Sequence, residues 1–247
     1  MPERQNTGPS PVRDAYAQAC LSSQLPADTE AVSNAAVALR RTGGASPFCS
    51  GVIVEPGVLL TARHCLFSPE GGGTTQYWSY LAQARLEIVT AGGAVYRVAC
   101  ATSDAEKKSP SVISCAARSS TSKFGVDSDF LVLNIVGLPS NFQGMKMAVP
   151  KQGSELLLFA QFEGIDGPRY SKTGCTLAEV KQRCAIHRCQ AGHSSSGGPL
   201  IFRNENNELR VGGIHVGAIA DSPACGMDGS EQVNAGVLLT ASGGAIR

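Results

Sequence analysis

One histidine lies where the sequence predicts the end of a buried strand, a position from which it could move protons. The apolar segment 58–62 runs directly into Arg63, His64 and Cys65. Histidine is the one side chain whose ordinary pKa lets it take up and return a proton near neutral pH. A lone histidine at a strand end is more often structural than catalytic. Cys49 opens the preceding apolar run, and together with Cys65 it could pin the loop that holds the imidazole.

An aspartate lies at the mouth of another apolar run. Asp129 directly precedes the segment 130–133, Phe-Leu-Val-Leu, and Asp127 is the alternative two residues earlier. A carboxylate in this position can accept the Nδ1–H of an imidazole, which fixes the tautomer and stabilises the imidazolium. An aspartate that only caps a strand is the commoner case, so this motif gains meaning from the others.

A serine followed by two glycines supplies a candidate nucleophile. The segment 192–200 reads Gly-His-Ser-Ser-Ser-Gly-Gly-Pro-Leu, with Ser196 before the glycine pair. Glycine permits the sharp turn that exposes a serine hydroxyl, and consecutive N–H groups there can point at a developing oxyanion. Such a turn alone is usually only a turn, but the Pro-Leu and predicted strand that follow make it specific. His64, Asp129 and Ser196 together form a candidate triad for acyl transfer.

The elements that must position these residues are short strands. Gly-Gly, Pro-Gly and Asp-Gly-Pro sequences separate short apolar runs along the chain, and regular strand–helix alternation is missing. This pattern predicts an all-β sandwich or barrel. Residues 1–30 are polar and aperiodic, and we expect an N-terminal arm or propeptide remnant. The predicted strands are 35–40, 49–54, 58–62, 86–90, 95–100, 130–136, 156–162, 199–202, 209–216 and 233–240.

Composition excludes several classes of function. Hydrophobic residues make up 43% and charged residues 17% of 247 residues, which is typical of a globular chain. The 21 Lys and Arg against 20 Asp and Glu provide no footprint for nucleic acid, and no apolar run is long enough for a membrane span. Nine scattered cysteines favour disulfides in an oxidising compartment. Residues 1–10 lack the apolar core of a signal peptide, which fits either a removed signal or a fragment of a precursor.

The three motifs together resemble the trypsin/chymotrypsin family of serine proteases, whose marks are T-A-A-H-C, D-I-A-L-L and G-D-S-G-G-P-L. This chain has T-A-R-H-C at 61–65, D-F-L-V-L at 129–133 and S-G-G-P-L at 196–200, in the same order. The resemblance extends from about residue 35 to residue 240. It implies two packed six-stranded antiparallel β-barrels, with the active site in the cleft between them.

The resemblance also assigns roles. Residues 31–140 would form the first barrel, carrying His64 and Asp129, and residues 141–247 the second, carrying Ser196 and the specificity pocket. It implies a secreted or periplasmic serine endopeptidase that acts on protein or peptide substrates through an acyl-enzyme. We expect no cofactor, no metal, no nucleic-acid or membrane partner, and a monomer.

Two serines depart from the family pattern. Ser195 stands where digestive members carry the aspartate that pairs with a newly released N-terminus, and the I-V-G-G start is absent. We therefore expect no activation by a cleaved amino terminus, as in the bacterial and glutamyl-endopeptidase branches. Ser194 replaces a glycine of the oxyanion hole, for which the resemblance implies the backbone N–H groups of Ser194 and Ser196. A Cβ restricts the backbone there, so this position is where loss of activity would arise.

The segment 212–217, Gly-Gly-Ile-His-Val-Gly, matches the strand that lines the first specificity pocket in the family. A G-I-H version resembles glutamyl endopeptidases and viral cysteine proteases of this fold, in which the histidine contacts a Glu or Gln of the substrate. His215 could donate to such an oxygen, although a histidine that only packs is equally expected. No acid occurs at 189–191 to attract Lys or Arg. The residues assigned to substrate binding are Gln190, Ala191, His215, Val216 and Gly217.

The resemblance implies a disulfide between Cys49 and Cys65, and further bridges around the specificity pocket whose pairing stays open. Cys100 and Cys115 could tie the base of a surface loop, 103–121. The pocket cysteines are Cys175, Cys184, Cys189 and Cys225.

Three other functions compete with a protease. A silent homologue could bind a partner through the same cleft, although all three triad positions are filled. An α/β hydrolase requires G-x-S-x-G, which residues 192–196 break at the last position. A zinc site is a weaker alternative because two cysteines at x4 spacing lack a second pair; its ligands would be Cys184, His187, Cys189 and His193.

Overall fold

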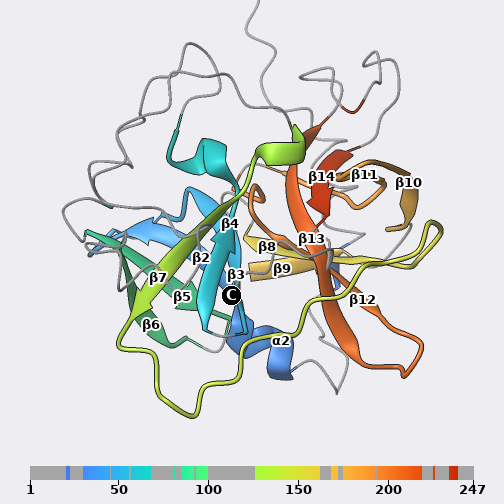
Figure 1. Cartoon of the computed structure of the whole chain (residues 1–247). Helices are drawn as coiled ribbons and strands as arrows, with labels where there is room; N and C mark the ends of the chain where they lie inside the picture. The colour runs from blue at the N-terminus through green and yellow to red at the C-terminus, as the bar shows by residue number, and fades with distance from the viewer. Residues whose placement is uncertain are drawn as a thin grey trace, which may run out of the picture.

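The chain forms two β-sheets that lie side by side; in Figure 1 the first runs from blue to yellow-green and the second, apart from the short N-terminal β1, from yellow to red. The computed structural model describes residues 21–22, 30–44, 46–55, 57–67, 81, 85–91, 93–99, 126–161, 168–171, 175–192, 194–218, 225 and 234–238. In chain order the elements are β1 (Leu21–Ser22), α2 (Glu30–Ala35), β2 (Ala36–Arg41), β3 (Cys49–Val54), β4 (Val58–Thr61), η1 (Arg63–Cys65), β5 (Leu86–Thr90), β6 (Val95–Ala99), η2 (Val126–Ser128), β7 (Leu131–Val136), β8 (Leu157–Gln161), β9 (Pro168–Ser171), β10 (Leu177–Lys181), β11 (Cys184–His187), β12 (Pro199–Arg203), β13 (Leu209–Ala218) and β14 (Asn234–Leu238). The predicted all-β class is confirmed. No helix in these ranges is long and apolar enough to cross a bilayer.

The first sheet is a closed barrel with the strand order β2-β3-β4-β7-β6-β5. All its pairs are antiparallel, and apolar side chains fill its interior; Ile53, Leu59, Leu60 and Leu133 are fully buried. Every residue of β3 is buried, and its sequence is apolar except for Ser50. The prediction of a six-stranded first barrel is therefore confirmed.

The second sheet differs from the closed six-stranded barrel that the resemblance implied. It has eight strands in the order β1-β9-β8-β12-β13-β14-β11-β10. An isolated bridge between Glu155 and Thr176 links the segment before β8 with the start of β10, but strand pairing within the described ranges does not close the sheet. A separate apolar core, which includes Leu158, Leu177 and Leu200, lies in this half of the molecule.

Several elements were not predicted. The helix α2 occupies residues expected to follow an aperiodic arm, and its two buried side chains, Val32 and Ala35, are three residues apart on one face. The arm itself contributes β1, which pairs with β9. Strands β10 and β11 were also missed: four of the five residues of β10 are half-buried, so its sequence lacks a clear alternation.

The segment between the two sheets is hydrogen-bonded to both. Met145 exchanges backbone bonds with Ile53 and Glu55 at the end of β3, at 3.0 and 3.2 Å. Val211 of β13 then bonds with Lys146 and Ala148 at 3.0 and 3.1 Å. This connecting segment, residues 144–148, therefore holds the barrel and the second sheet in one arrangement.

Candidate active site

Strand pairing in the barrel brings His64 and Asp129 to the same end. β4 and β7 are antiparallel, with Thr61 opposite Leu131, so the residues just after β4 and just before β7 are neighbours. The backbone N–H of His64 donates to Asp129 Oδ1 at 2.8 Å, and His64 Nδ1 lies 2.7 Å from Asp129 Oδ2. Asp129 is 5% exposed, whereas the side chain of His64 is 25% exposed. The carboxylate thus orients the imidazole, and no residue that the structure describes forms a hydrogen bond with His64 Nε2.

The alternative acid, Asp127, has a side chain that lies outside the described residues. It is Asp129 that makes both contacts with His64.

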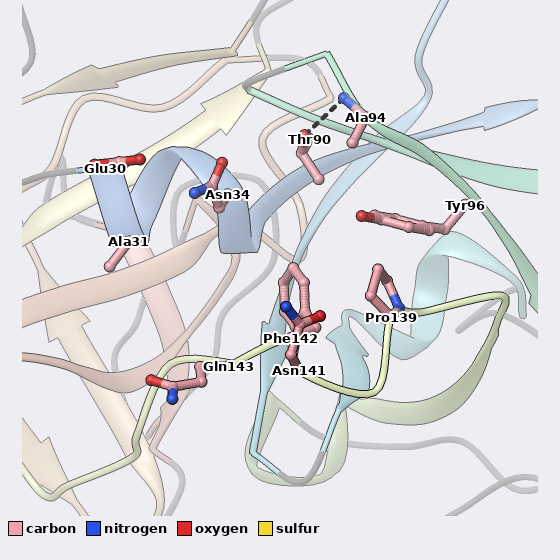
Figure 2. Close-up of a pocket in the computed structure, with 10 residues that line it drawn as sticks. All are labelled: Glu30, Ala31, Asn34, Thr90, Ala94, Tyr96, Pro139, Asn141, Phe142 and Gln143. Atoms are coloured by element: carbon pink, nitrogen blue, oxygen red, sulfur yellow. Dashed lines mark hydrogen bonds between the residues drawn. The ribbon is translucent and has the colours of Figure 1, made fainter.

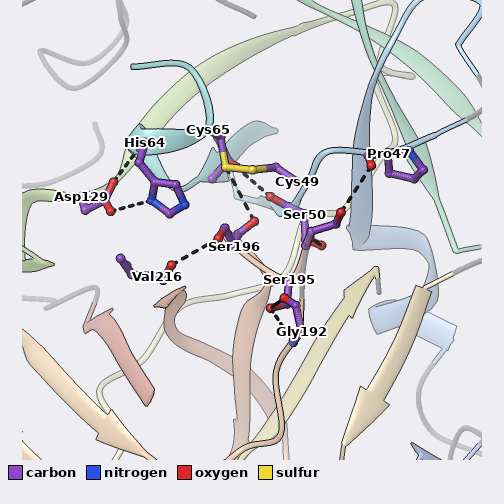
Figure 3. Close-up of a disulfide and its surroundings, with 12 residues drawn as sticks. Pro47, Cys49, Ser50, His64, Cys65, Asp129, Gly192, Ser195, Ser196 and Val216 are labelled. Atoms are coloured by element: carbon purple, nitrogen blue, oxygen red, sulfur yellow. Dashed lines mark hydrogen bonds and ion pairs between the residues drawn. A yellow bond between two sulfur atoms is a disulfide. The ribbon is translucent and has the colours of Figure 1, made fainter. Parts of the chain in front are cut away.

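The turn that carries Ser196 is held against the barrel. The backbone N–H of Ser50 on β3 donates to Ser196 O at 2.8 Å, and Cys65 Sγ lies 3.8 Å from the same oxygen. Gly197 has φ +83°, and a Cβ there would collide with the Ser50 carbonyl oxygen and Thr61 Oγ1, so only glycine fits. In Figure 3 the His64 ring is drawn between Asp129 and Ser196.

The hydroxyl of Ser196 points to the second sheet in this structure. Ser196 Oγ donates to Val216 O at 3.2 Å (Figure 3). No hydrogen bond between Ser196 Oγ and His64 is formed in the described structure. A change in the Ser196 rotamer would be needed before its proton could pass to the imidazole.

A local hydrogen-bonded ring supports the turn before the serine. Ser195 is fully buried, its Oγ donates to Gly192 O at 2.5 Å, and Gly192 N–H donates back to Ser195 Oγ at 3.2 Å. Ser194 has φ +66°, and its N–H, like that of Ser196, donates to no other described residue. Within the described residues, neither N–H group is occupied by an acceptor.

Two buried histidines meet beneath the site, one from β11 and one from β13. His215 Nδ1 lies 3.2 Å from His187 Nε2, and the rings cross at 76°. Cys189 N–H donates to His187 Nδ1 at 3.3 Å, so the proton of neutral His187 is on Nε2 and points at His215 Nδ1. The proton of neutral His215 must then be on its Nε2. The sequence singled out His187 only as a possible zinc ligand, because nothing local signals a partner 28 residues away.

Burial keeps both rings neutral. Desolvation lowers the pKa of His187 from 6.5 to about 3, against a smaller opposing effect of its bond to the Ala235 backbone. The pKa of His215 is lowered well below its ordinary value, first by burial and then by the neighbouring His187 and His64. Around neutral pH, His215 can therefore donate one hydrogen bond but carries no charge.

The other predicted pocket residues lie along the same region. Gln190 and Ala191 are half-buried and follow Cys189, whose carbonyl accepts from Asn234 Nδ2 at 2.6 Å. Val216 is 9% exposed, and a Cβ built on Gly217 would meet nothing within 4 Å. Open space beside Gly217 is compatible with a substrate side chain.

Six cysteines form three disulfides within the described residues. Cys49 pairs with Cys65, as the resemblance implied. The two pairings left open are Cys175–Cys189 and Cys184–Cys225. Because the sulfurs of Cys184 and Cys189 are used in this way, the alternative of a zinc site is wrong. Cys100, Cys115 and His193 lie outside the described residues.

A hollow of about 560 Å³ lies away from the candidate triad (Figure 2). It is formed by α2, the β5–β6 hairpin and residues 139–143. Tyr96 and Phe142 meet edge to face at its wall, with their ring centroids 6.3 Å apart. Its lining residues are Glu30, Ala31, Asn34, Thr90, Ala94, Tyr96, Pro139, Asn141, Phe142 and Gln143.

Comparison with known proteins supports the fold at low sequence identity. No family model and no curated protein sequence matches this chain. Among solved structures, a Glu endopeptidase is similar, with TM-score 0.55, 13% identity, and coverage of 88% of this chain and 91% of that one. The active form of the protease Rv3671c from M. tuberculosis has a TM-score of 0.52 and 13% identity, with coverage of 89% of this chain and 86% of that one. A serine endoprotease from Yersinia pestis has a TM-score of 0.52 and 13% identity, with coverage of 87% of this chain and 64% of that one. The chain therefore has the fold of the trypsin/chymotrypsin-like serine proteases.

Proposed function

We propose that this chain is a secreted or periplasmic serine endopeptidase with His64, Asp129 and Ser196 as its catalytic triad. The observation that carries the proposal is the double contact of a buried Asp129 with the backbone and ring of His64. It is the arrangement that general-base catalysis requires, since it holds one tautomer and supports the imidazolium. Three disulfides in the described residues fit an oxidising compartment.

The mechanism follows from these roles. Ser196 Oγ attacks the scissile carbonyl carbon while His64 Nε2 takes its proton, and the carbonyl oxygen becomes an oxyanion. The N–H groups of Ser194 and Ser196 stabilise that oxyanion. His64 then gives the proton to the leaving amine, which departs and leaves an acyl-enzyme on Ser196. Water, deprotonated by His64, releases the acid.

Labelling by a fluorophosphonate probe tests the proposal. Wild-type protein is expected to become labelled, and Ser196→Ala is expected to abolish labelling. Ser140→Ala, which changes an exposed serine on a turn, is the matched control and should label like wild type. Labelling that survives in Ser196→Ala would contradict the assignment of the nucleophile.

We further propose cleavage after Glu or Gln. A neutral His215 with its proton on Nε2 can donate to an amide or a carboxylate oxygen, and open space adjoins Gly217 on the same strand. Similarity to a Glu endopeptidase is in keeping with this preference. Profiling with a peptide library tests it: preferred cleavage after Lys or Arg would reject the assignment.

A binding module without catalysis is the second candidate. The observation in its favour is that Ser196 Oγ donates to Val216 O in this structure. Absence of both labelling and peptide hydrolysis, in protein that unfolds cooperatively, would favour this candidate over the enzyme.

A further inference from the structure

Ser194 holds a backbone conformation that serine ordinarily avoids. Its φ is +66°, in the left-handed region where a Cβ crowds the following carbonyl oxygen. Glycine enters this region at no steric cost, and serine does not. The surrounding fold must therefore hold Ser194 in place.

A serine from the barrel contacts the carbonyl oxygen of Ser194. Ser50 Oγ donates to Ser194 O at 2.7 Å, and Ser50 is completely buried. Because ψ of Ser194 sets the direction of this oxygen, the bond favours one orientation of the peptide that follows. Ser194 Oγ adds a longer bond of 3.4 Å to Pro47 O, which precedes β3.

Ser50 is itself fixed by strand β3 and its neighbours. Its N–H donates to Ser196 O at 2.8 Å, and its carbonyl oxygen accepts from Thr61 Oγ1 at 2.7 Å. Its neighbour Cys49 is in the disulfide to Cys65. The hydroxyl that reaches Ser194 is thus presented by a rigid strand of the closed barrel.

We propose that Ser50 is a positioning residue for catalysis: its hydroxyl keeps Ser194 in the left-handed conformation that presents the Ser194 N–H to the oxyanion. The inference rests on the proposed function and deepens it. Ser50 does not touch the reacting atoms and acts only through Ser194. The barrel thereby compensates for a Cβ at a position where glycine would need no such support.

Four proteins test this role: wild type, Ser50→Ala, Ser194→Gly and the double variant. Without the Ser50 hydroxyl, Ser194 should leave the left-handed region most of the time, so kcat should fall about tenfold with KM within about twofold. With glycine at 194 the same Ser50→Ala change should lower kcat by less than about threefold. Ser194→Gly alone changes the residue that carries an oxyanion N–H, so its kcat is the reference rate for the double variant and not an unchanged control.

A transition-state analogue separates positioning from packing. A peptide aldehyde forms a hemiacetal with Ser196 whose oxygen occupies the oxyanion position, so its inhibition constant in Ser50→Ala should rise by the same factor as kcat falls. A product peptide, which lacks that oxyanion, should bind equally to both proteins. The matched control is Thr90→Val, which removes another buried hydroxyl of the barrel, one that accepts from Ala94 N–H at 3.0 Å (Figure 2); its kcat should not change.

Three results would overturn the inference in an active enzyme. They are an unchanged kcat in Ser50→Ala, an equal loss with Ser and with Gly at 194, and a rise of more than about tenfold in Ser194→Gly alone. The last measurement decides the question even if Ser50→Ala does not fold. Wild-type protein that neither hydrolyses peptides nor reacts with a fluorophosphonate would instead overturn the proposed function, and this inference with it.

Discussion

Acid should destabilise this protein through His187, because the ring is buried and neutral. Above pH 6.5 neither the folded nor the unfolded state binds a proton there, so this ring contributes no pH dependence. Below pH 6.5 the unfolded chain takes up a proton that the folded chain refuses until about pH 3. The free energy of unfolding therefore falls as the pH falls through this window.

The size of the effect follows from the two pKa values. At pH 4.5 the pH lies two units below the ordinary value of 6.5, and each unit corresponds to about 1.4 kcal/mol, so His187 should cost about 3 kcal/mol. That is a large share of the about 5–15 kcal/mol by which domains are stable. The variant His187→Gln keeps an amide donor toward His215 and cannot be protonated.

Urea unfolding at pH 7.5 and 4.5, with disulfides intact, measures the difference. Wild type should lose about 3 kcal/mol more than His187→Gln between the two pH values, because other titrating groups contribute alike to both proteins. An equal loss in the two proteins would show that His187 becomes protonated in the folded state. The reasoning from burial would then be wrong.

Three further changes give defined outcomes. Gly197→Ala should lower the free energy of unfolding by about 2 kcal/mol or more, because φ is positive and a Cβ meets the Ser50 carbonyl; an unchanged melting temperature would contradict this. Asp129→Asn should lower kcat in a fluorogenic peptide assay by about 10⁴-fold, since an amide favours the wrong tautomer of its imidazole partner, and a loss below about tenfold would exclude the proposed role. Replacing Cys49 and Cys65 by alanine opens a loop with a sequence separation of 16 and should cost about 3 kcal/mol in urea unfolding, whereas an unshifted midpoint would count against it.

Several strands of the barrel were predictable because each is an apolar run bounded by turn residues. The predicted ranges 49–54 and 86–90 coincide with β3 and β5. Strands β10 and β11 were not, since four of the five residues of β10 are half-buried and show no alternation, while Cys184 and His187 of β11 suggested a bridge or a metal site. The eight-stranded second sheet also exceeded the expectation, because pairing of β1 with β9 joins segments far apart in sequence.

In the candidate site, too, the residues in local motifs were predictable and the contacts across the fold were not. Its motifs made His64, Asp129 and Ser196 visible, since each carries a local pattern. Contacts across the fold carried no such pattern: Ser50 reaches a carbonyl 144 residues away. Only the packing of one sheet against the other reveals such partners.

The connecting segment, residues 144–148, links the two parts of the candidate site. His64 and Asp129 belong to the barrel and Ser196 to the second sheet, while Met145 and Lys146 are bonded to one sheet each. An added Cβ at Gly144 would strike the backbone of Val54, so the two segments are closely packed at this junction. Backbone hydrogen bonds from this short segment to both sheets oppose the opening of one half away from the other. In the proposed enzyme, we therefore expect the backbones that carry His64 and Ser196 to keep the same spacing before and after a peptide binds.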